Sequence, residues 1–224
     1  NSKKYAVGFK PFGDLIFPYH NMGNIDSVNL FDLDELIIFS FYTSNRNHYR
    51  NVLDAGANLG IHSLLLDKCG FDVRCFEPDP THFKLLKENL AINGCKNVKP
   101  TNKAVSTQEG EKEFVRVMGN TTGSHLAGCK ENPYGDLERF MVEVADIRPH
   151  LEWADLVKMD VEGHEKEVLL ATPRELWETT DALVEVQDQR NAEDIFKFFT
   201  DSQVNLFPQK INWKRAKTVE DIPV

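Results

Sequence analysis

The sequence has few cysteines, and their spacing matches no metal-binding or redox motif. Successive cysteines are 6, 20 and 34 positions apart, so no CxxC pair occurs. Four cysteines in 224 residues also exclude a small scaffold held together by disulfides. We therefore expect reduced, mostly buried thiols and a reducing, cytoplasmic environment for Cys69, Cys75, Cys95 and Cys129.

Long hydrophobic runs are missing as well. The longest apolar stretch, residues 36–42, is far shorter than the roughly 20 residues that a transmembrane helix needs. The first residues contain no apolar signal core, and the chain does not begin with methionine, as expected of a fragment or a processed form. We therefore expect no membrane partner.

Basic residues are outnumbered by acidic ones. The chain has 26 lysines and arginines against 35 aspartates and glutamates, which gives a formal net charge of −9. Such a charge does not suit non-specific binding to nucleic-acid phosphates or to anionic membranes. Hydrophobic residues make up 41% and charged residues 27%, which is ordinary for a folded chain and excludes intrinsic disorder. The length suits one domain with a substantial core.

The first fifty residues predict an extension that packs on the rest of the chain. Aromatic and branched residues flank a turn at 11–13, which predicts a β-hairpin. Asp32 and Glu35 have the spacing of a capping box and predict the start of a helix. We expect this extension to cover residues 1–50 and to precede a single domain over residues 51–224.

From residue 51 onward, short apolar strands alternate with helices. This alternation predicts an α/β fold, in which a mostly parallel sheet carries helices on both faces. Ligands of such sheets bind at the carboxyl ends of the strands, so candidate site residues should follow the strands. The expected helices lie at 61–69, 80–92, 164–171 and 191–200. The expected strands lie at 51–55, 72–76, 98–104, 114–117, 141–144, 156–160 and 183–186, with two more at 204–207 and around Trp213.

A glycine-containing turn follows the first of these strands and opens a helix. Gly56 and Gly60 allow a sharp turn and a close approach of the backbone to a ligand, and the helix N-terminus offers free N–H donors. Asn58 stands where a nicotinamide-binding G-x-G-x-x-G motif needs its second glycine, and no Walker lysine follows. The pattern Asp54-x-Gly56-x-Asn58-x-Gly60 instead matches the turn of enzymes that use S-adenosylmethionine (SAM).

An acidic residue follows the second strand. Glu77 lies 23 positions after Asp54, where its carboxylate can accept hydrogen bonds from both hydroxyls of a ribose. Its neighbours Phe76 and Pro78 could form a wall for adenine or could simply pack in the core. Together with the glycine turn at this spacing, Glu77 indicates a nucleoside ligand.

More polar residues end the strand at 156–160. A carboxylate at Asp160 can hold the cationic amino group of a methionine moiety, which we favour over a divalent metal. Glu162 and His164 follow in the turn to the next helix. Because a helix N-terminus disfavours imidazolium, His164 is expected to stay neutral and able to accept a proton, unless it faces solvent at the helix start.

Four motifs stand in order along the chain: Val52–Gly60, Phe76–Pro80, Asn102–Val105 and Asp155–Glu165. Together they resemble the FkbM family of SAM-dependent methyltransferases. The resemblance implies a Rossmann-like class I methyltransferase fold with a seven-stranded, mostly parallel sheet whose last strand is antiparallel. It also implies SAM as cofactor, S-adenosylhomocysteine as product, and O-methylation of a hydroxyl on a sugar, glycan or polyketide-type natural product.

The resemblance further implies roles for individual residues. The glycine turn would contact the methionine end of SAM, Glu77 the ribose, and residues 102–104 the adenine, while Asp160 and Glu162 would lie near the transferred methyl group. No metal ligand is expected. The residues expected to bind the cofactor are Asp54, Gly56, Asn58, Gly60, Glu77, Pro78, Asn102, Ala104 and Asp160.

The expected reaction is in-line transfer of the sulfonium methyl group to an acceptor hydroxyl. An aliphatic hydroxyl is a poor nucleophile while it is protonated, so a positioned base accelerates the transfer. The candidate bases are His164, Glu162 and His125, in that order. His125 lies in a polar loop at 119–125, which could be a substrate lid or a plain hairpin connection.

Two alternatives stay open at the level of sequence. The same fold could methylate a nucleic acid, or it could be a non-catalytic module that binds SAM or nothing. The net negative charge disfavours the first, and the intact set of Asp54, Glu77 and Asp160 disfavours the second. We therefore expect a small-molecule or glycan acceptor as the partner.

Overall fold

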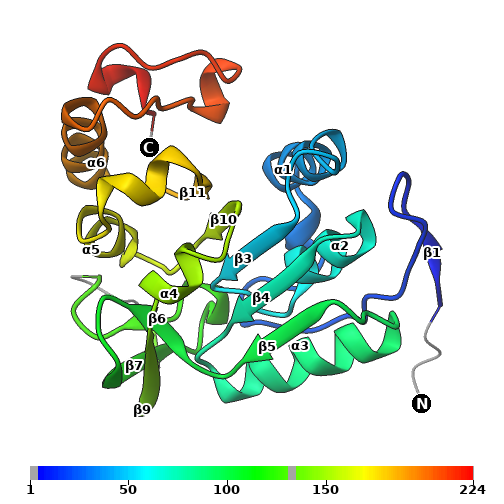
Figure 1. Ribbon diagram of the computed structural model, residues 1–224. Coiled ribbons are helices and arrows are strands. Elements are labelled where there is room, and N and C mark those ends of the chain that lie inside the picture. Colours follow the sequence, from blue (N-terminus) through cyan, green and yellow to red (C-terminus); the bar gives the residue numbers. More distant parts are fainter. Residues whose placement is uncertain (1–4, 131–134, 224) are drawn as a thin grey trace.

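A sheet of five parallel strands lies at the centre of the molecule (Figure 1). The computed structural model describes residues 5–130 and 135–223. All neighbouring strands of this sheet pair in parallel, which confirms the expected α/β fold. The order across the sheet is β11 (Asp181–Val184), β10 (Leu156–Met159), β3 (Asn51–Ala55), β4 (Asp72–Phe76) and β5 (Val98–Thr101).

Helices cover both faces of this sheet (Figure 1), and successive side chains of each strand alternate between them. Val52 and Leu156 pack in the core with α1 to α3, whereas Leu53 and Val157 pack in the core with α4 to α6. Strands that are covered on both faces are apolar throughout, which explains the short apolar runs in the sequence. The helices are α1 (Leu33–Ser44), α2 (Ile61–Cys69), α3 (Pro80–Ile92), α4 (Arg148–Leu151), α5 (Glu165–Leu170) and α6 (Gln189–Asp201).

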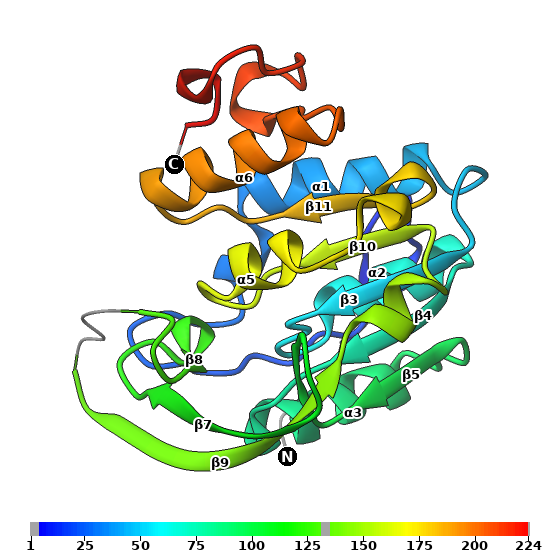
Figure 2. The same ribbon diagram turned by 60° about the vertical axis from the view of Figure 1, so that its left-hand side comes forward.

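A second sheet lies beside the end of the central sheet at which the parallel strands terminate (Figure 2). Its strands are β6 (Ala104–Ser106), β9 (Leu137–Asp146), β7 (Gly110–Val117) and β8 (His125–Leu126), in this order. Phe114, Leu126 and Val142 form its separate core. The expectation of one strand over 98–104 is wrong, because β5 ends at Thr101 and the chain then enters β6 of the second sheet.

The number of strands in the central sheet also differs from the seven that the resemblance implies. Among the described residues the sheet has five strands and no antiparallel member. The strands expected at 204–207 and around Trp213 are not formed. Phe207 is 50% exposed, and Trp213 stacks on Phe41 of α1 with ring centroids 6.1 Å apart. This part of the chain therefore packs in part against α1 and adds no strand to the sheet.

The segment before β3 packs beside α2 and α3. The short strands β1 (Val7–Gly8) and β2 (Asp14–Leu15) pair antiparallel, which confirms the expected hairpin. The Asp32 side chain accepts a hydrogen bond of 3.0 Å from the Glu35 backbone N–H, so α1 starts where the capping spacing predicted. Phe9, Phe31 and Phe39 make edge-to-face ring contacts that join the segment to the main core.

The remaining helical elements are single turns of 3-10 helix. Within the described residues, no helix is long and apolar enough to cross a membrane. All four cysteines are free, in agreement with their spacing. The 3-10 turns lie at Asn29–Phe31, Thr121–Gly123, Arg174–Glu178, Gln209–Ile211 and Val219–Asp221.

Candidate functional site

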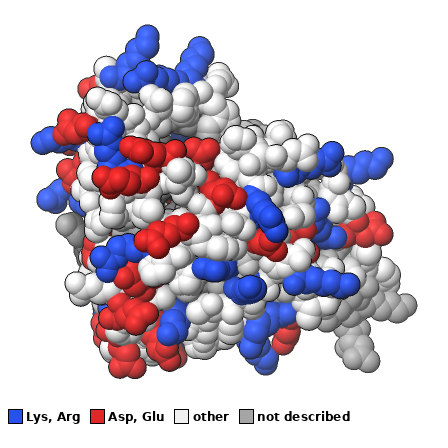
Figure 3. All heavy atoms as spheres, viewed as in Figure 1, with Lys and Arg blue, Asp and Glu red and all other residues white. Residues whose placement is uncertain are grey.

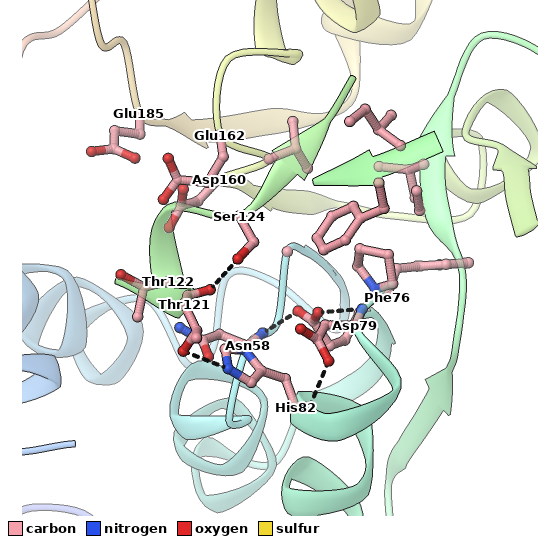
Figure 4. A pocket seen from close by; sticks show the side chains of 18 of the residues that line it. Asn58, Phe76, Asp79, His82, Thr121, Thr122, Ser124, Asp160, Glu162 and Glu185 are labelled. Atoms are coloured by element: carbon pink, nitrogen blue, oxygen red, sulfur yellow. Dashed lines mark hydrogen bonds between the residues drawn. The ribbon is translucent and has the colours of Figure 1, made fainter. Parts of the chain in front are cut away.

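A pocket opens where the carboxyl ends of the central strands meet the second sheet (Figure 4). Its floor comes from the loops after β3, β4, β10 and β11, and Phe114 and Leu126 contribute from the second sheet. Leu30 and Glu35 of the N-terminal segment also line it. The site therefore lies at the edge of the sheet where ligands of parallel α/β sheets bind.

The glycine turn after β3 forms one wall of this pocket. Gly56 has φ of +80°, and a Cβ atom on it would lie 1.7 Å from the backbone oxygen of Asp160. Any side chain at this position would therefore separate the loops after β3 and β10. Gly60 has φ of +84° and faces Leu86 of α3, so its role is helix packing outside the pocket.

Glu77 is fixed by backbone donors from two loops. Its carboxylate accepts hydrogen bonds of 2.8 Å from the backbone N–H groups of Asn58 and Asp79, and the residue is 6% exposed. Burial raises the pKa of Glu77 to about 8, although the two N–H donors favour the carboxylate. Asn58 adopts a left-handed conformation with φ of 52°, and its side-chain oxygen is buried without a hydrogen-bond partner.

Asp54 lies beneath the pocket and does not line it. It is fully buried, and one carboxylate oxygen accepts a 2.6 Å hydrogen bond from the Ser63 hydroxyl. The other oxygen, Oδ1, has no hydrogen-bond partner among residues 5–130 and 135–223, and the Lys158 ammonium lies 4.0 Å from it. The same ammonium lies 3.3 Å from Asp160 Oδ2. Lys158 therefore links the two acids across neighbouring strands.

Sequence reasoning missed this role of Lys158. The residue is 7% exposed and donates to the backbone oxygen of Gly56 at 3.4 Å. Burial disfavours its charged form, but the carboxylates of Asp160 and Asp54 outweigh burial and raise the pKa of Lys158. A lysine inside an otherwise apolar strand was the available signal, since a buried lysine is rare without paired acids.

Three carboxyl groups gather where β10 and β11 end (Figure 4). Each of Asp160, Glu162 and Glu185 offers an oxygen atom, and these atoms all lie within 4.8 Å of one another. Oxygen donors so arranged could hold a divalent cation, or they could hold the polar groups of an organic ligand. Glu185 was not foreseen, because the strand that ends before it was expected at 183–186 rather than at Asp181–Val184.

The charges of this cluster are uneven. Burial opposes ionisation of Asp160, but the Lys158 ammonium outweighs it and keeps the pKa of Asp160 below its ordinary value. Burial and the Asp160 charge raise the pKa of Glu162, and they raise that of Glu185 to about 8. Glu162 also has a left-handed backbone with φ of 56°, and it accepts hydrogen bonds from the side chains of Lys130 and Gln187.

Neither expected histidine lines the pocket. His164 Nε2 lies 2.9 Å from the Ser106 hydroxyl, and Nδ1 lies 3.2 Å from the Glu167 carboxylate. Burial lowers the pKa of His164, as it does for His125, whose Nδ1 lies 3.0 Å from the Gly123 backbone oxygen. Of the three candidate bases, only Glu162 borders the cavity.

Beside Glu77 and Asp79, apolar side chains line the pocket. Phe76, Pro78 and Ala104 line it, together with Val105. The Asn102 amide does not border the cavity, because its nitrogen donates to the backbone oxygens of residues 77 and 78 at 2.8 and 3.0 Å. Asn102 thereby stabilises the loop after β4, which carries the pocket-lining acids Glu77 and Asp79.

A third wall comes from the loop before β8. Thr121, Thr122 and Ser124 line the pocket, and the Thr121 hydroxyl lies 2.9 Å from His82 Nε2. The polar loop expected at 119–125 therefore borders the site through these residues. His82 was not foreseen, because it lies in α3 with no motif around it.

The arrangement suits a ligand that carries both hydroxyl groups and a positive charge. Asp54 Oδ1, Asn58 Oδ1 and Asp160 Oδ1 are buried acceptors without hydrogen-bond partners among the described residues. Unpaired buried acceptors are uncommon unless a ligand or water completes them. Two of them belong to residues that line the pocket, so donors on a bound molecule would satisfy them.

A family model described as "Methyltransferase FkbM domain" matches residues 54–207. The chain is 30% identical over 160 residues to methyltransferase sdnD of Sordaria araneosa, a match over 57% of this chain and 62% of that protein. It is 27% identical over 165 residues to the hexuronic acid methyltransferase AglP of Haloferax volcanii, over 71% of this chain and 65% of that protein. The chain thus spans less than two thirds of the length of either relative.

Solved structures that are similar to the chain include two that are titled methyltransferases. A SAM-dependent methyltransferase from Agrobacterium tumefaciens matches with a TM-score of 0.49 and 8% identity, over 89% of this chain and 59% of that one. A precorrin-6y C5,15-methyltransferase from Geobacter metallireducens matches with a TM-score of 0.45 and 11% identity, over 84% of this chain and 82% of that one.

Proposed function

The chain belongs to the family of FkbM methyltransferase domains, and from this premise we propose that it transfers a methyl group from SAM to a hydroxyl of a sugar, glycan or natural product. SAM is the cofactor expected of this family. The proposal assigns the ribose to Glu77, the adenine to the wall formed by Pro78 and Ala104, and the methionine moiety to the Gly56 turn and Asp160.

The observation that carries the proposal is the order of polar groups along the sheet edge. Glu77 follows β4, Gly56 follows the adjacent β3, and Asp160 follows β10 on its other side, so all three border one elongated cavity. SAM has the same sequence of features, with two ribose hydroxyls followed by a cationic amino-acid end. The buried acceptor without a partner at Asp160 suits the donors at that end.

The acidic cluster supports a neutral acceptor. Carboxyl oxygens accept hydrogen bonds from sugar hydroxyls, whereas the ionised Asp160, which already raises the pKa of Glu162 and Glu185, would repel an anionic group placed in the cluster. Of the two curated relatives, one is named for a hexuronic acid. For this chain we therefore propose a neutral hydroxyl, on a sugar or a natural product, in preference to a uronate carboxylate.

The surface charge also favours a small or glycan acceptor. On the face shown in Figure 3, basic side chains are scattered among acidic and uncharged ones and form no continuous band. A protein that tracks a nucleic-acid backbone concentrates lysine and arginine along its path. This face therefore lends no support to a nucleic-acid acceptor.

The proposed mechanism relies on positioning and on one proton transfer. When bound, the cofactor supplies an activated methyl group. The walls of the pocket align the acceptor oxygen with that carbon, and such orientation can contribute about 7–11 kcal/mol. We assign the base to Glu185, whose carboxylate takes the hydroxyl proton as the new C–O bond forms and then releases it to solvent. Glu162 lies beside it and keeps the acceptor hydroxyl oriented.

Two measurements test this function. Calorimetry should detect binding of S-adenosylhomocysteine to the wild-type chain, and Glu77→Ala should weaken it at least about tenfold because both ribose contacts are lost. Glu88→Ala, an exposed acid on α3, is the matched control and should bind as wild type. If the wild-type chain does not bind this nucleoside at millimolar concentration, the proposed function is wrong.

Turnover should depend on Glu185. With methyl-labelled SAM and a panel of neutral sugars, uronates and glycans, Glu185→Gln should slow transfer about 10²–10⁴-fold while binding of S-adenosylhomocysteine is retained. Because a base acts only when deprotonated, the wild-type rate should rise with pH up to about 8, and the variant should lose this rise. Glu193→Gln, exposed on α6, should leave the rate unchanged. A normal rate in Glu185→Gln would remove this residue from the mechanism.

A further inference from the structure

We propose that Glu35, which precedes the matched family domain, binds the amino group of the methionine moiety of SAM. The inference rests on the proposed function and adds a cofactor contact from the N-terminal segment. The family model matches residues 54–207, so this residue lies outside it. Glu35 nevertheless lines the same pocket as Gly56 and Asp160.

The start of α1 aims the Glu35 side chain. Its backbone N–H is bound by the Asp32 carboxylate at 3.0 Å, which fixes the first turn of the helix. In a full capping box the glutamate side chain would turn back to the Asp32 backbone. Here the carboxylate lies beside His62 of α2 instead, with Oε2 3.0 Å from Nε2, and 27% of the side chain is exposed.

Two polar side chains with little exposure to solvent, His62 and Tyr42, lie behind the Glu35 carboxylate. The Tyr42 hydroxyl lies 2.8 Å from His62 Nδ1, and Tyr42 is fully buried. Burial raises the pKa of Tyr42 well above its ordinary value, so its hydroxyl keeps its proton and shares a hydrogen bond with Nδ1. The other ring nitrogen of His62, Nε2, lies nearest to Glu35. Glu35 Oε2 is nevertheless a buried acceptor without a well-formed hydrogen bond among the described residues, so a donor on a bound ligand could satisfy it.

The charge around Glu35 matches a cation at the methionine end. Burial opposes ionisation of Glu35, but the His62 ring and the Lys158 ammonium outweigh it and lower its pKa. The negative charge of Asp160 has the opposite effect and raises the pKa of Glu35. Lys158 is already shared between Asp54 and Asp160, so Glu35 and Asp160 both face the pocket near a single lysine that also neutralises Asp54. An ammonium group with three N–H donors would supply the missing positive charge.

The N-terminal segment is joined to the opposite wall of the pocket. The Asn24 N–H donates to the Gly119 oxygen at 2.7 Å, and the Thr121 N–H donates to the Met22 oxygen at 2.9 Å. A Cβ on Gly23 would lie 2.4 Å from the Gly119 oxygen, so the two backbones are in direct contact. Because Thr121 also lines the cavity, the segment before α1 is hydrogen-bonded to a loop that forms part of the pocket wall.

A comparison of two nucleosides tests the inference. S-Adenosylhomocysteine carries the amino-acid end, whereas 5′-methylthioadenosine lacks it and keeps adenine, ribose and sulfur. Glu35→Gln should weaken calorimetric binding of the first at least about tenfold and leave the second unchanged within about twofold. Glu77→Ala should weaken both. Asp34→Asn, an exposed acid one position earlier in α1, should change neither.

The outcomes separate this inference from the proposed function. If Glu35→Gln weakens both nucleosides equally, Glu35 supports the pocket without contacting the amino group, and the inference is overturned. Equal affinities in wild type and variant overturn it as well. Should Glu35→Gln fold poorly, Glu35→Asp keeps the charge and should show a smaller, equally selective loss. A wild-type chain that binds neither nucleoside would overturn the proposed function together with the inference.

Discussion

At the scale of single residues, the most consequential arrangement is the buried lysine between two acids. Lys158 lies within 4.0 Å of Asp54 and 3.3 Å of Asp160, and little solvent reaches it. A charge in such surroundings is tolerated only because its partners are charged too. The same contacts hold Asp160 ionised and in position at the floor of the pocket.

Replacing this lysine should destabilise the fold strongly. Lys158→Met leaves Asp54 and Asp160 without their shared cation, and we expect the free energy of unfolding to fall by about 3–5 kcal/mol. Urea denaturation followed by circular dichroism measures this change.

A double variant provides the control. Lys158→Met combined with Asp54→Asn removes one of the two orphaned charges, so the loss should be smaller than in the single variant. If the two variants are equally unstable, the pairing of Lys158 with Asp54 contributes nothing to stability.

At the scale of elements, the site depends on close contact between the loops after two neighbouring strands. Residue 56 approaches the backbone of residue 160 so closely that only glycine fits there. The contact sets the distance between the glycine turn and the acidic cluster. It also explains why the glycine turn and the motif around Asp160 occur together in one chain.

Two glycine variants separate this contact from backbone strain. Gly56 and Gly70 both have positive φ, but a Cβ on Gly70 would meet nothing within 4 Å. Gly70→Ala should therefore lose only the roughly 1–2 kcal/mol of a left-handed alanine. Gly56→Ala should lose about 1–3 kcal/mol more, and binding of S-adenosylhomocysteine with it. Thermal unfolding of both variants measures the difference, and equal losses would contradict the proposed loop contact.

At the scale of the whole molecule, burial of carboxyl groups makes stability depend on pH. Glu77 and Glu185 have pKa values of about 8 in the fold against 4.5 for an ordinary glutamate. Between these values the unfolded chain has released the protons that the folded chain still holds. Stability of the ligand-free protein should therefore fall as pH rises from about 5 to 8.

The contribution of Glu185 to this fall in stability with pH can be measured separately. Each proton retained by the fold contributes at most about 1.4 kcal/mol per pH unit, and less for Glu185, whose exposed side chain is screened by solvent. Glu185→Gln removes one titrating group, so its free energy of unfolding should fall less steeply with pH than that of the wild type. Urea titrations at several pH values between 5 and 8 measure both slopes, and parallel curves would show that Glu185 does not titrate in this range.

The sequence determined most of the helices and strands and most of the cavity floor, because both depend on residues that are close together in the chain. Strand–helix alternation, the cap at Asp32 and the turn at Gly56 each depend on residues a few positions apart. Glu77 and Asp160 could be placed for the same reason, since an acid directly after a parallel strand must lie at the ligand-binding edge.

Only the tertiary structure decided which side chains face the cavity and which do not. Glu35 and Glu185 reach it from segments that lie far apart in the chain, and His164 turns away because the second sheet offers it the Ser106 hydroxyl. The last two expected strands are also absent, and Trp213 stacks on Phe41 of α1 instead. The direction of these side chains depends on contacts between distant parts of the chain. The energies of such contacts cannot be inferred from a local sequence pattern.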